Sequence, residues 1–76
     1  MPYIPKPKPC YIDNFEFYKV ISGRKVYRGK DRYYSWDELH GEIEVFDKLR
    51  YHLGALDAVT GKMIKGAKKG RRLPDV

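Results

Sequence analysis

The sequence lacks the cysteines needed for disulfide stabilisation, and it has no long apolar run. Cys10 is the only cysteine among 76 residues, which excludes an internal disulfide and a cysteine-rich zinc ribbon. No stretch is long and apolar enough to cross a bilayer or to serve as the core of a signal peptide, so we expect neither a membrane span nor a cleavable secretion signal. A chain this short forms one domain, which buries only about 60% of the surface that the unfolded chain exposes.

Charge is abundant but unevenly placed. The 16 Lys and Arg residues against 10 Asp and Glu give a net charge of +6, which favours a polyanionic partner. Residues 1–36 carry eight basic and three acidic side chains, and residues 48–76 carry eight basic and two acidic ones. Residues 37–47 carry five carboxylates and no Lys or Arg. Carboxylates within a basic surface do not help to hold phosphates, so this acidic block indicates chemistry.

The N-terminal residues are rich in proline. Residues 1–9 alternate proline with other residues and end in Lys-Pro-Lys-Pro. Proline fixes φ and donates no backbone hydrogen bond, which favours an extended, polyproline-like conformation. We therefore divide the chain into a lead-in or linker at 1–12 and a catalytic domain at 13–76. A lead-in without any function explains this composition equally well.

Residues 13–23 allow two interpretations. Asp13 and Glu16 have the spacing of a helix N-cap and its capping-box acid, which predicts a short helix over 14–21 that ends at Ser22-Gly23. However, Phe15 and Phe17 alternate with Glu16 and Tyr18, which favours a strand. We predict the helix.

The rest of the chain has the alternation and turn residues of β-structure. Strands are expected over 25–28, 32–36, 41–46, 50–56 and 62–65, and the tail over 66–72 is expected to be irregular. Short turns between strands produce antiparallel neighbours. The predicted fold class is α+β, mostly β, with a short N-terminal helix followed by a small, highly twisted antiparallel sheet of four to six strands.

The acidic block contains an imidazole and several carboxylates, which can serve as acid and base in RNA cleavage without a metal. Such cleavage requires a base for the 2′-hydroxyl, an acid for the leaving 5′ oxygen and a cation for the phosphate. If one strand includes His40, its side chain shares a face with Glu42 and Glu44. His40 and Glu44 would then stand about 13 Å apart at ~3.3 Å per residue, and a bulge at Gly41 would shorten that distance. A solvated acidic strand is the simpler alternative. We predict no metal site, because one histidine among alternating carboxylates is not a recognised ligand spacing.

Three blocks of residues resemble a known family. The run Tyr34-Ser35-Trp36-Asp37-Glu38-Leu39-His40-Gly41-Glu42-Ile43-Glu44 resembles the Y-x-W-D-x-x-H-G-E-[LI]-E block of the ribosome-cleaving E-type colicins and cloacin. His52-Leu53-Gly54-Ala55-Leu56-Asp57 resembles their H-L-G-x-x-D, and Thr60-Gly61, Lys65-Gly66 and a C-terminal Arg follow in register. The likeness covers residues 31–72. It does not extend to residues 1–23, and Ala58 stands where that family has proline.

The resemblance implies a function. Members of that family are exported toxins that enter the cytoplasm of a target bacterium and cut 16S ribosomal RNA in the decoding site. They act without cofactor or metal, and a small acidic immunity protein protects the producer. By position, Glu44 is implied as the general base, His40 as the general acid, Asp37 as the residue that orients His40, and Arg71, with Arg72 as a rival, as the phosphate-stabilising cation. We expect a monomer.

We predict that two groups of basic residues contact RNA. The first, at the first hairpin, is Arg24, Lys25, Arg28, Lys30 and Arg32, and the second, near the C-terminus, is Lys62, Lys65, Lys68, Lys69 and Arg72. Tyr34 is an aromatic residue that could stack on a base. A solvated surface explains the first group almost as well. His52 is expected to be structural. The alternatives for function are a ribonuclease of the same fold that acts on another RNA, such as tRNA, and a non-catalytic RNA-binding module.

Overall fold

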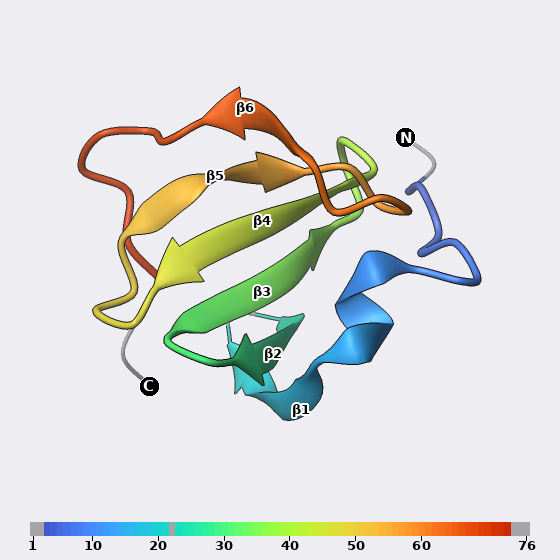
Figure 1. Cartoon of the computed structure of the whole chain (residues 1–76), viewed down its shortest axis with the longest axis horizontal. Helices are drawn as coiled ribbons and strands as arrows, with labels where there is room; N and C mark the ends of the chain where they lie inside the picture. Colours follow the sequence, from blue (N-terminus) through green and yellow to red (C-terminus); the bar gives the residue numbers. More distant parts are fainter. Residues whose placement is uncertain (1–2, 22, 74–76) are drawn as a thin grey trace.

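The computed structural model describes residues 3–21 and 23–73, and it contains one antiparallel sheet in which each strand lies beside its neighbours in sequence. Figure 1 shows the strand order β1-β2-β3-β4-β5-β6, with a 3₁₀ turn, η1, ahead of β1. The bounds are η1 Tyr11–Asn14, β1 Glu16–Ile21, β2 Arg24–Gly29, β3 Arg32–Asp37, β4 Glu42–Asp47, β5 His52–Leu56 and β6 Met63–Gly66. The predicted antiparallel, mostly β architecture is confirmed.

The predicted N-terminal helix is wrong. Residues 16–21 form β1, which pairs with β2 from Glu16↔Arg28 to Ile21↔Arg24. The expected cap, Asp13, instead belongs to η1, where its carboxylate accepts the Cys10 backbone N–H at 3.3 Å. An isolated short helix is marginal in water, whereas pairing with β2 gives these residues a ladder of hydrogen bonds along one side, interrupted between Phe17 and Lys19. Ser22, the expected helix terminator, lies outside the described residues.

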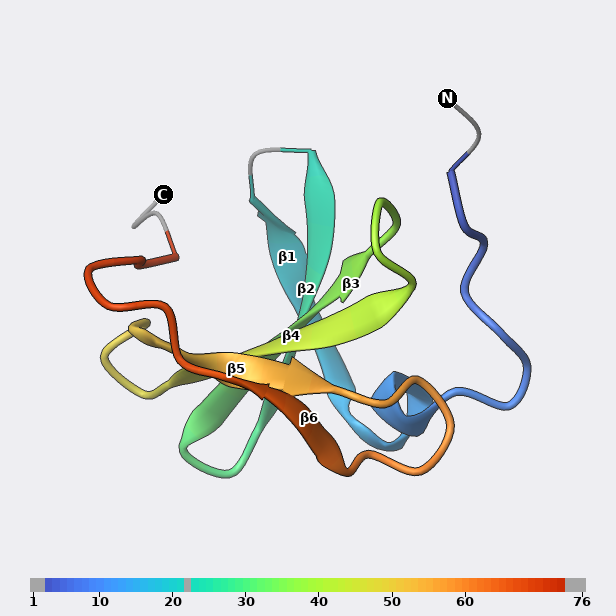
Figure 2. The same ribbon diagram turned by 90° about the horizontal axis from the view of Figure 1, so that it is seen from above.

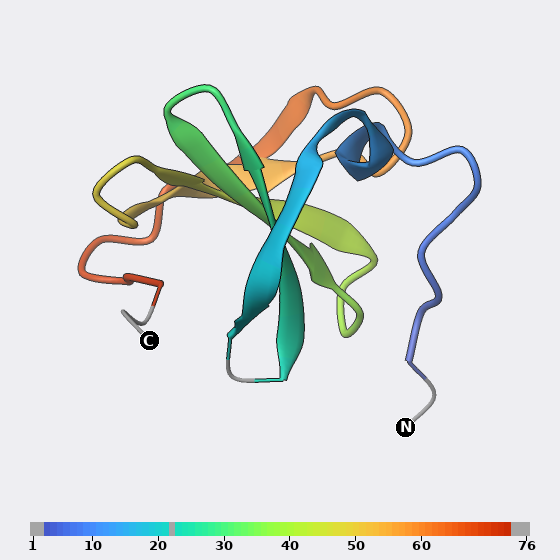
Figure 3. The same ribbon diagram turned by 90° about the horizontal axis from the view of Figure 1, so that it is seen from below.

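The strands twist strongly, so that the β1–β2 hairpin crosses the direction of β4, β5 and β6 (Figure 2). One face of the sheet packs against Ile12 of η1. Figure 3 shows η1 beside the start of β1 and the loop between β5 and β6. The core on this face includes Ile12, Tyr34, Ile43, Val45 and Leu56. Because strand side chains alternate, the residues between them point to the other face. A smaller cluster of Ile21, Val26, Phe46 and Leu73 lies there.

The N-terminal segment runs beside the turn between β3 and β4 (Figure 2). Its contacts are specific: the Ile4 N–H donates to the Glu38 carbonyl at 2.7 Å, and the Trp36 indole N–H donates to the Ile4 carbonyl at 3.1 Å. Cys10 and Ile12 are buried in the core. Whether residues 1–12 also serve as a linker stays a prediction, and residues 1 and 2 lie outside the described residues. Over residues 3–21 and 23–73, no helix is long and apolar enough to cross a membrane.

Candidate active site

The β3–β4 pairing places the acidic residues on the face opposite the main core. Ser35 pairs with Glu44, and Asp37 pairs with Glu42. His40 lies in the turn that joins the two strands rather than on β4. Gly41 has φ +68° and its N–H bonds to the Asp37 carbonyl at 2.8 Å, which reverses the chain tightly. The condition for a face shared by His40, Glu42 and Glu44 is therefore not met, because His40 lies outside β4. The turn brings the imidazole back over the Asp37 carboxylate.

Glu44 lies at the centre of this face, 5% exposed, and two guanidinium groups hold it. Arg71 forms a bidentate pair, with its Nη1 2.6 Å from Oε1 and its Nη2 2.7 Å from Oε2. Arg24 donates from Nη1 to Oε2 at 2.9 Å. A carboxylate offers about four acceptor positions, and these contacts use three of them. One position on Oε1 remains for a proton.

Asp37 and His40 form a second pair beside it. The Asp37 Oδ2 lies 2.8 Å from His40 Nδ1, while Oδ1 accepts the backbone N–H groups of Leu39 and His40 at 3.0 and 3.3 Å. Burial raises the pKa of Asp37, but hydrogen bonds from the His40 side chain and from both backbone N–H groups outweigh it, so the pKa lies below its usual value. With Nδ1 held by the carboxylate, His40 presents Nε2 to the outside, and its side chain is 59% exposed.

His52 is a buried neighbour of Glu44. Its Nδ1 accepts the Lys68 backbone N–H at 3.0 Å, so the neutral ring carries its proton on Nε2, which lies 3.9 Å from Glu44 Oε1. Burial lowers the pKa of His52; the Glu44 charge opposes this shift, and the Arg71 and Lys68 charges add to it. His52 was expected to be structural, and it contacts both the backbone and, more loosely, a carboxylate. The sequence predicted a partner in the backbone or a neighbouring carboxylate, but it did not identify that carboxylate as Glu44.

These groups open onto one cavity of about 120 Å³. Its walls come from β2, β3, β4, β5, β6 and the C-terminal tail, and its polar lining includes Arg24, Asp37, His40, Glu44, Lys68 and Arg71. Four cations and three carboxylates line the cavity. Two of the carboxylates are paired with lining cations, Glu44 with Arg24 and Arg71 and Glu42 with Lys65. The cavity can therefore receive an anion, and it presents a carboxylate and an imidazole to that anion. A phosphate has the charge and the acceptor oxygens that suit two guanidinium groups.

Four of the residues expected to bind RNA lie at or next to the cavity. Arg24, Lys65 and Lys68 line it, and Lys65 forms an ion pair with Glu42 at 2.9 Å. Arg72 follows Arg71 but points elsewhere, since its Nε donates to the Leu49 carbonyl at 3.1 Å and its guanidinium lies 5.2 Å from the Tyr51 ring centroid.

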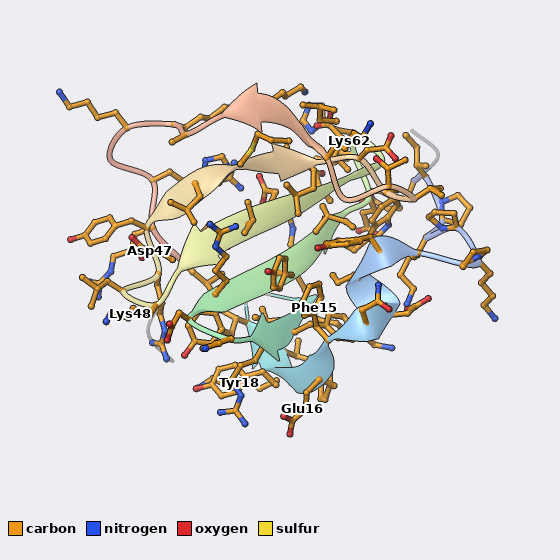
Figure 4. The ribbon with its side chains drawn as sticks, viewed as in Figure 1. Phe15, Glu16, Tyr18, Asp47, Lys48 and Lys62 are labelled. Carbon is orange, nitrogen blue, oxygen red and sulfur yellow. The ribbon has the colours of Figure 1, made fainter. Side chains whose placement is uncertain are left out.

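The other residues of that prediction lie away from the cavity. Arg28 is paired with Glu16 at 3.7 Å, and Arg32 lies at the opposite end of β3 from Asp37. Tyr34 is 6% exposed and stacks on Phe15 at 4.0 Å within the core. Its burial raises its pKa. The remaining four, Lys25, Lys30, Lys62 and Lys69, are exposed and do not line the cavity. Figure 4 shows where Lys62 lies.

The acidic residues of the site are not arranged as a set of metal ligands. Among residues 3–21 and 23–73, no group of three or more His, Cys, Asp or Glu side chains is arranged to hold a metal ion. The carboxylates of Asp37 and Glu44 are instead directed at His40 and at guanidinium groups.

Comparison with known proteins assigns most of the chain to one protein family. A family model described as Cytotoxic matches residues 17–74. No curated protein matches the chain. The family match starts at Phe17, well before Asp31, so most of β1 and all of β2 belong to the shared region, which the sequence resemblance did not reach. Arg24, Asp37, His40, Glu44 and Arg71 all lie within the match.

Proposed function

The chain belongs to the Cytotoxic family and is a toxin nuclease domain of the colicin and cloacin type, and from this premise we propose that it is an endoribonuclease that cleaves 16S ribosomal RNA in the decoding site by metal-free acid–base catalysis. The observation that carries the proposal is the arrangement of Glu44 under two guanidinium groups beside the Asp37–His40 pair, in one cavity.

In the proposed reaction, Glu44 Oε1 takes the proton of the 2′-hydroxyl. The 2′ oxygen attacks phosphorus, and the bond from phosphorus to the 5′ oxygen breaks. His40 Nε2 gives its proton to that leaving oxygen, and the products are a 2′,3′-cyclic phosphate and a free 5′-hydroxyl. Asp37 holds Nδ1 of His40 at 2.8 Å, which fixes the ring and stabilises its cationic form before it acts as the acid.

Arg71 and Arg24 support the base in the free enzyme and the phosphate in the complex. Each guanidinium has five N–H donors, and the contacts to Glu44 use two from Arg71 and one from Arg24. The remaining donors can hold the non-bridging oxygens as negative charge develops on the pentacoordinate phosphorus. Arg71 makes the bidentate contact, whereas Arg72 is engaged with Leu49 and Tyr51. This geometry supports Arg71 as the catalytic arginine.

The biological setting follows from the same premise. A toxin nuclease must be silenced where it is made, so we propose that a small acidic immunity protein binds the basic domain. The domain acts after export, in the cytoplasm of a target bacterium, with residues 1–12 joining it to whatever delivers it. We also propose that the domain is a monomer and needs no cofactor.

The direct test is incubation with intact ribosomes, with deproteinised ribosomal RNA and with tRNA, followed by gel analysis. Excess EDTA is added only to the deproteinised RNA, because intact ribosomes need Mg²⁺ to stay assembled. We expect one cut in the small-subunit RNA of intact ribosomes, and cleavage of the deproteinised RNA that persists in EDTA. Glu44→Gln protein, confirmed as folded, is the control for contaminating nuclease. Loss of cleavage in EDTA that returns with a divalent ion would overturn the acid–base scheme. Preferential cleavage of tRNA would show that tRNA, and not 16S ribosomal RNA, is the substrate.

A further inference from the structure

We propose that a second cavity, between the N-terminal segment and the β2–β3 pair, binds one unpaired nucleotide of the RNA next to the cleaved phosphate; this inference rests on the proposed nuclease function. The cavity has a volume of about 300 Å³, at the low end of the ~300–1,000 Å³ typical of small-ligand sites. Its side-chain lining is made by Lys6, Arg24, Lys25, Tyr27, Trp36 and Glu38.

The lining joins cations with aromatic rings. Lys25 and Tyr27 lie two residues apart on β2. Tyr27 pairs with Tyr34, which lies two residues before Trp36 on β3. Alternation therefore puts Lys25, Tyr27 and Trp36 on one face of the two strands, which is the main-core face opposite Asp37 and Glu44. Three cations and one carboxylate line the cavity. Lys6 is paired with Asp13 and Arg24 with Glu44, so Lys25 is the lining cation that we expect to contact a phosphate. Aromatic faces beside cations are the combination with which proteins hold splayed, single-stranded bases and their phosphates.

The two rings are held in place by the N-terminal segment. The Trp36 indole N–H donates to the Ile4 carbonyl at 3.1 Å, and the Ile4 N–H in turn bonds to the Glu38 carbonyl at 2.7 Å. Lys6 Nζ lies 5.6 Å from the Tyr27 ring centroid and is fixed there by Asp13 at 2.6 Å. Tyr27 and Trp36 are both partly exposed. Rings that are already oriented lose little freedom when a base stacks on them.

Arg24 connects this cavity to the active site. Its side chain lines both cavities, and it bonds to Glu44 at 2.9 Å. It stands at the start of β2, whose end of the sheet also carries Asp37 and the turn with His40. An RNA strand that leaves the catalytic cavity past Arg24 therefore passes over this end of the sheet into the second cavity. We expect a nucleotide without a base-pairing partner to take that path, because its base is free to stack on Tyr27 and Trp36.

The N-terminal segment contributes one wall of this cavity, and it lies outside the region matched by the family model. Lys6 and Ile4 precede the residues matched by the family model, which begin at Phe17. The segment thus adds a wall to a shared catalytic domain, and we expect that wall to affect substrate binding more than the chemical step.

The test uses the single tryptophan of the chain as a reporter. A 2′-O-methyl RNA heptanucleotide, which lacks the nucleophilic hydroxyl, is titrated into the wild-type protein while the Trp36 indole N–H resonance and tryptophan fluorescence are followed. We expect the resonance to shift and the fluorescence to fall with the same affinity, whereas inorganic phosphate alone leaves both nearly unchanged. Lys25→Ala and Tyr27→Leu should each weaken binding on the order of tenfold, the scale of one base stack or phosphate contact.

Lys48→Ala is the matched control, because Lys48 is an equally exposed lysine in the β4–β5 turn, away from both cavities (Figure 4). It should bind the oligonucleotide like the wild type. Lys25 is exposed, so its variant remains decisive if Tyr27→Leu fails to fold. Unchanged Trp36 signals in a protein that still cleaves ribosomal RNA would overturn the second site and leave the nuclease function standing. Binding at Trp36 without cleavage of any RNA would support the site and contradict the nuclease.

Discussion

Replacing Asp37 with Asn separates the catalytic role of this carboxylate from its structural role. Asp37 Oδ1 accepts two backbone N–H groups from the turn, and Oδ2 contacts His40 Nδ1 at 2.8 Å. An Asn side chain keeps an oxygen for both backbone donors, so the turn is retained. Its NH₂ group then faces Nδ1 and opposes protonation of the ring. His40 thereby loses the support for the cationic form that acts as the acid.

The two consequences differ greatly in size. The stability change is expected below about 1 kcal/mol, because the Asp37–His40 pair involves an imidazole that is 59% exposed to solvent. The rate of cleavage should fall by about 10²–10⁴, the usual contribution of general acid–base catalysis; a comparable carboxylate-to-amide change in a serine protease costs about 10⁴.

The assay for this variant is single-turnover cleavage of ribosomes as a function of pH, with thermal unfolding measured in parallel. The rate of Asp37→Asn should lie below that of the wild type across the whole pH range. Asp37→Ala should lose additional stability, because it also removes the acceptor for the two backbone donors. A folded Asp37→Asn protein with a rate close to that of the wild type would refute the assignment of His40 as an acid oriented by Asp37.

Three further predictions follow from the same contacts. Arg71→Ala should lower the single-turnover rate by roughly 10²–10³, as for the loss of one donor to a developing anion, while Arg72→Ala should change it little; the reverse order would exchange their roles. Because burial lowers the pKa of His52 below its ordinary 6.5, the unfolded state takes up a proton first as the pH falls through about 6.5, so unfolding free energy should decline below that pH. Urea titrations should show a shallower decline in His52→Asn, and an identical decline would contradict a buried neutral ring. Association with the cognate acidic immunity protein should be fast and should slow as ionic strength rises in stopped-flow experiments; a slow, salt-independent rate would exclude charge steering.

The proposed catalytic residues could be found from sequence to the extent that they are close together along the chain. Asp37, His40 and Glu44 fall in one short block, and a strand–turn–strand unit brings such a block together whatever the rest of the fold. Arg71 was reached only through the family spacing after Gly61, and it does contact Glu44. The shape of the turn at Gly41 was not predicted. Strands were expected over 32–36 and 41–46, and a bulge at Gly41 was the expected way to bring His40 closer to Glu44.

Long-range pairing accounts for most of what the sequence did not reveal. Arg24 contacts Glu44 because β2, β3 and β4 are neighbours in the sheet, and its local sequence indicated only a basic hairpin. The helix prediction failed for a related reason, since a local cap signal at Asp13 competed with edge pairing that depends on β2. Tyr34 was expected at the RNA, although its alternation with Trp36 on one face already indicated the core side where it stacks on Phe15.

The identity of the general base is the central claim, and a comparison of two carboxylates on one face tests it most directly. Glu44 is buried and held by Arg24 and Arg71, whereas Glu42 is paired with Lys65 at 2.9 Å. The measurement is single-turnover cleavage of intact ribosomes by folded Glu44→Gln and Glu42→Gln proteins, with ribosome binding measured separately. Both variants carry the same carboxylate-to-amide change, so their rates can be compared directly. We predict a loss on the order of 10²–10⁴ for Glu44→Gln and a much smaller loss for Glu42→Gln. An inactive Glu42→Gln alongside an active Glu44→Gln would contradict the assignment of the base.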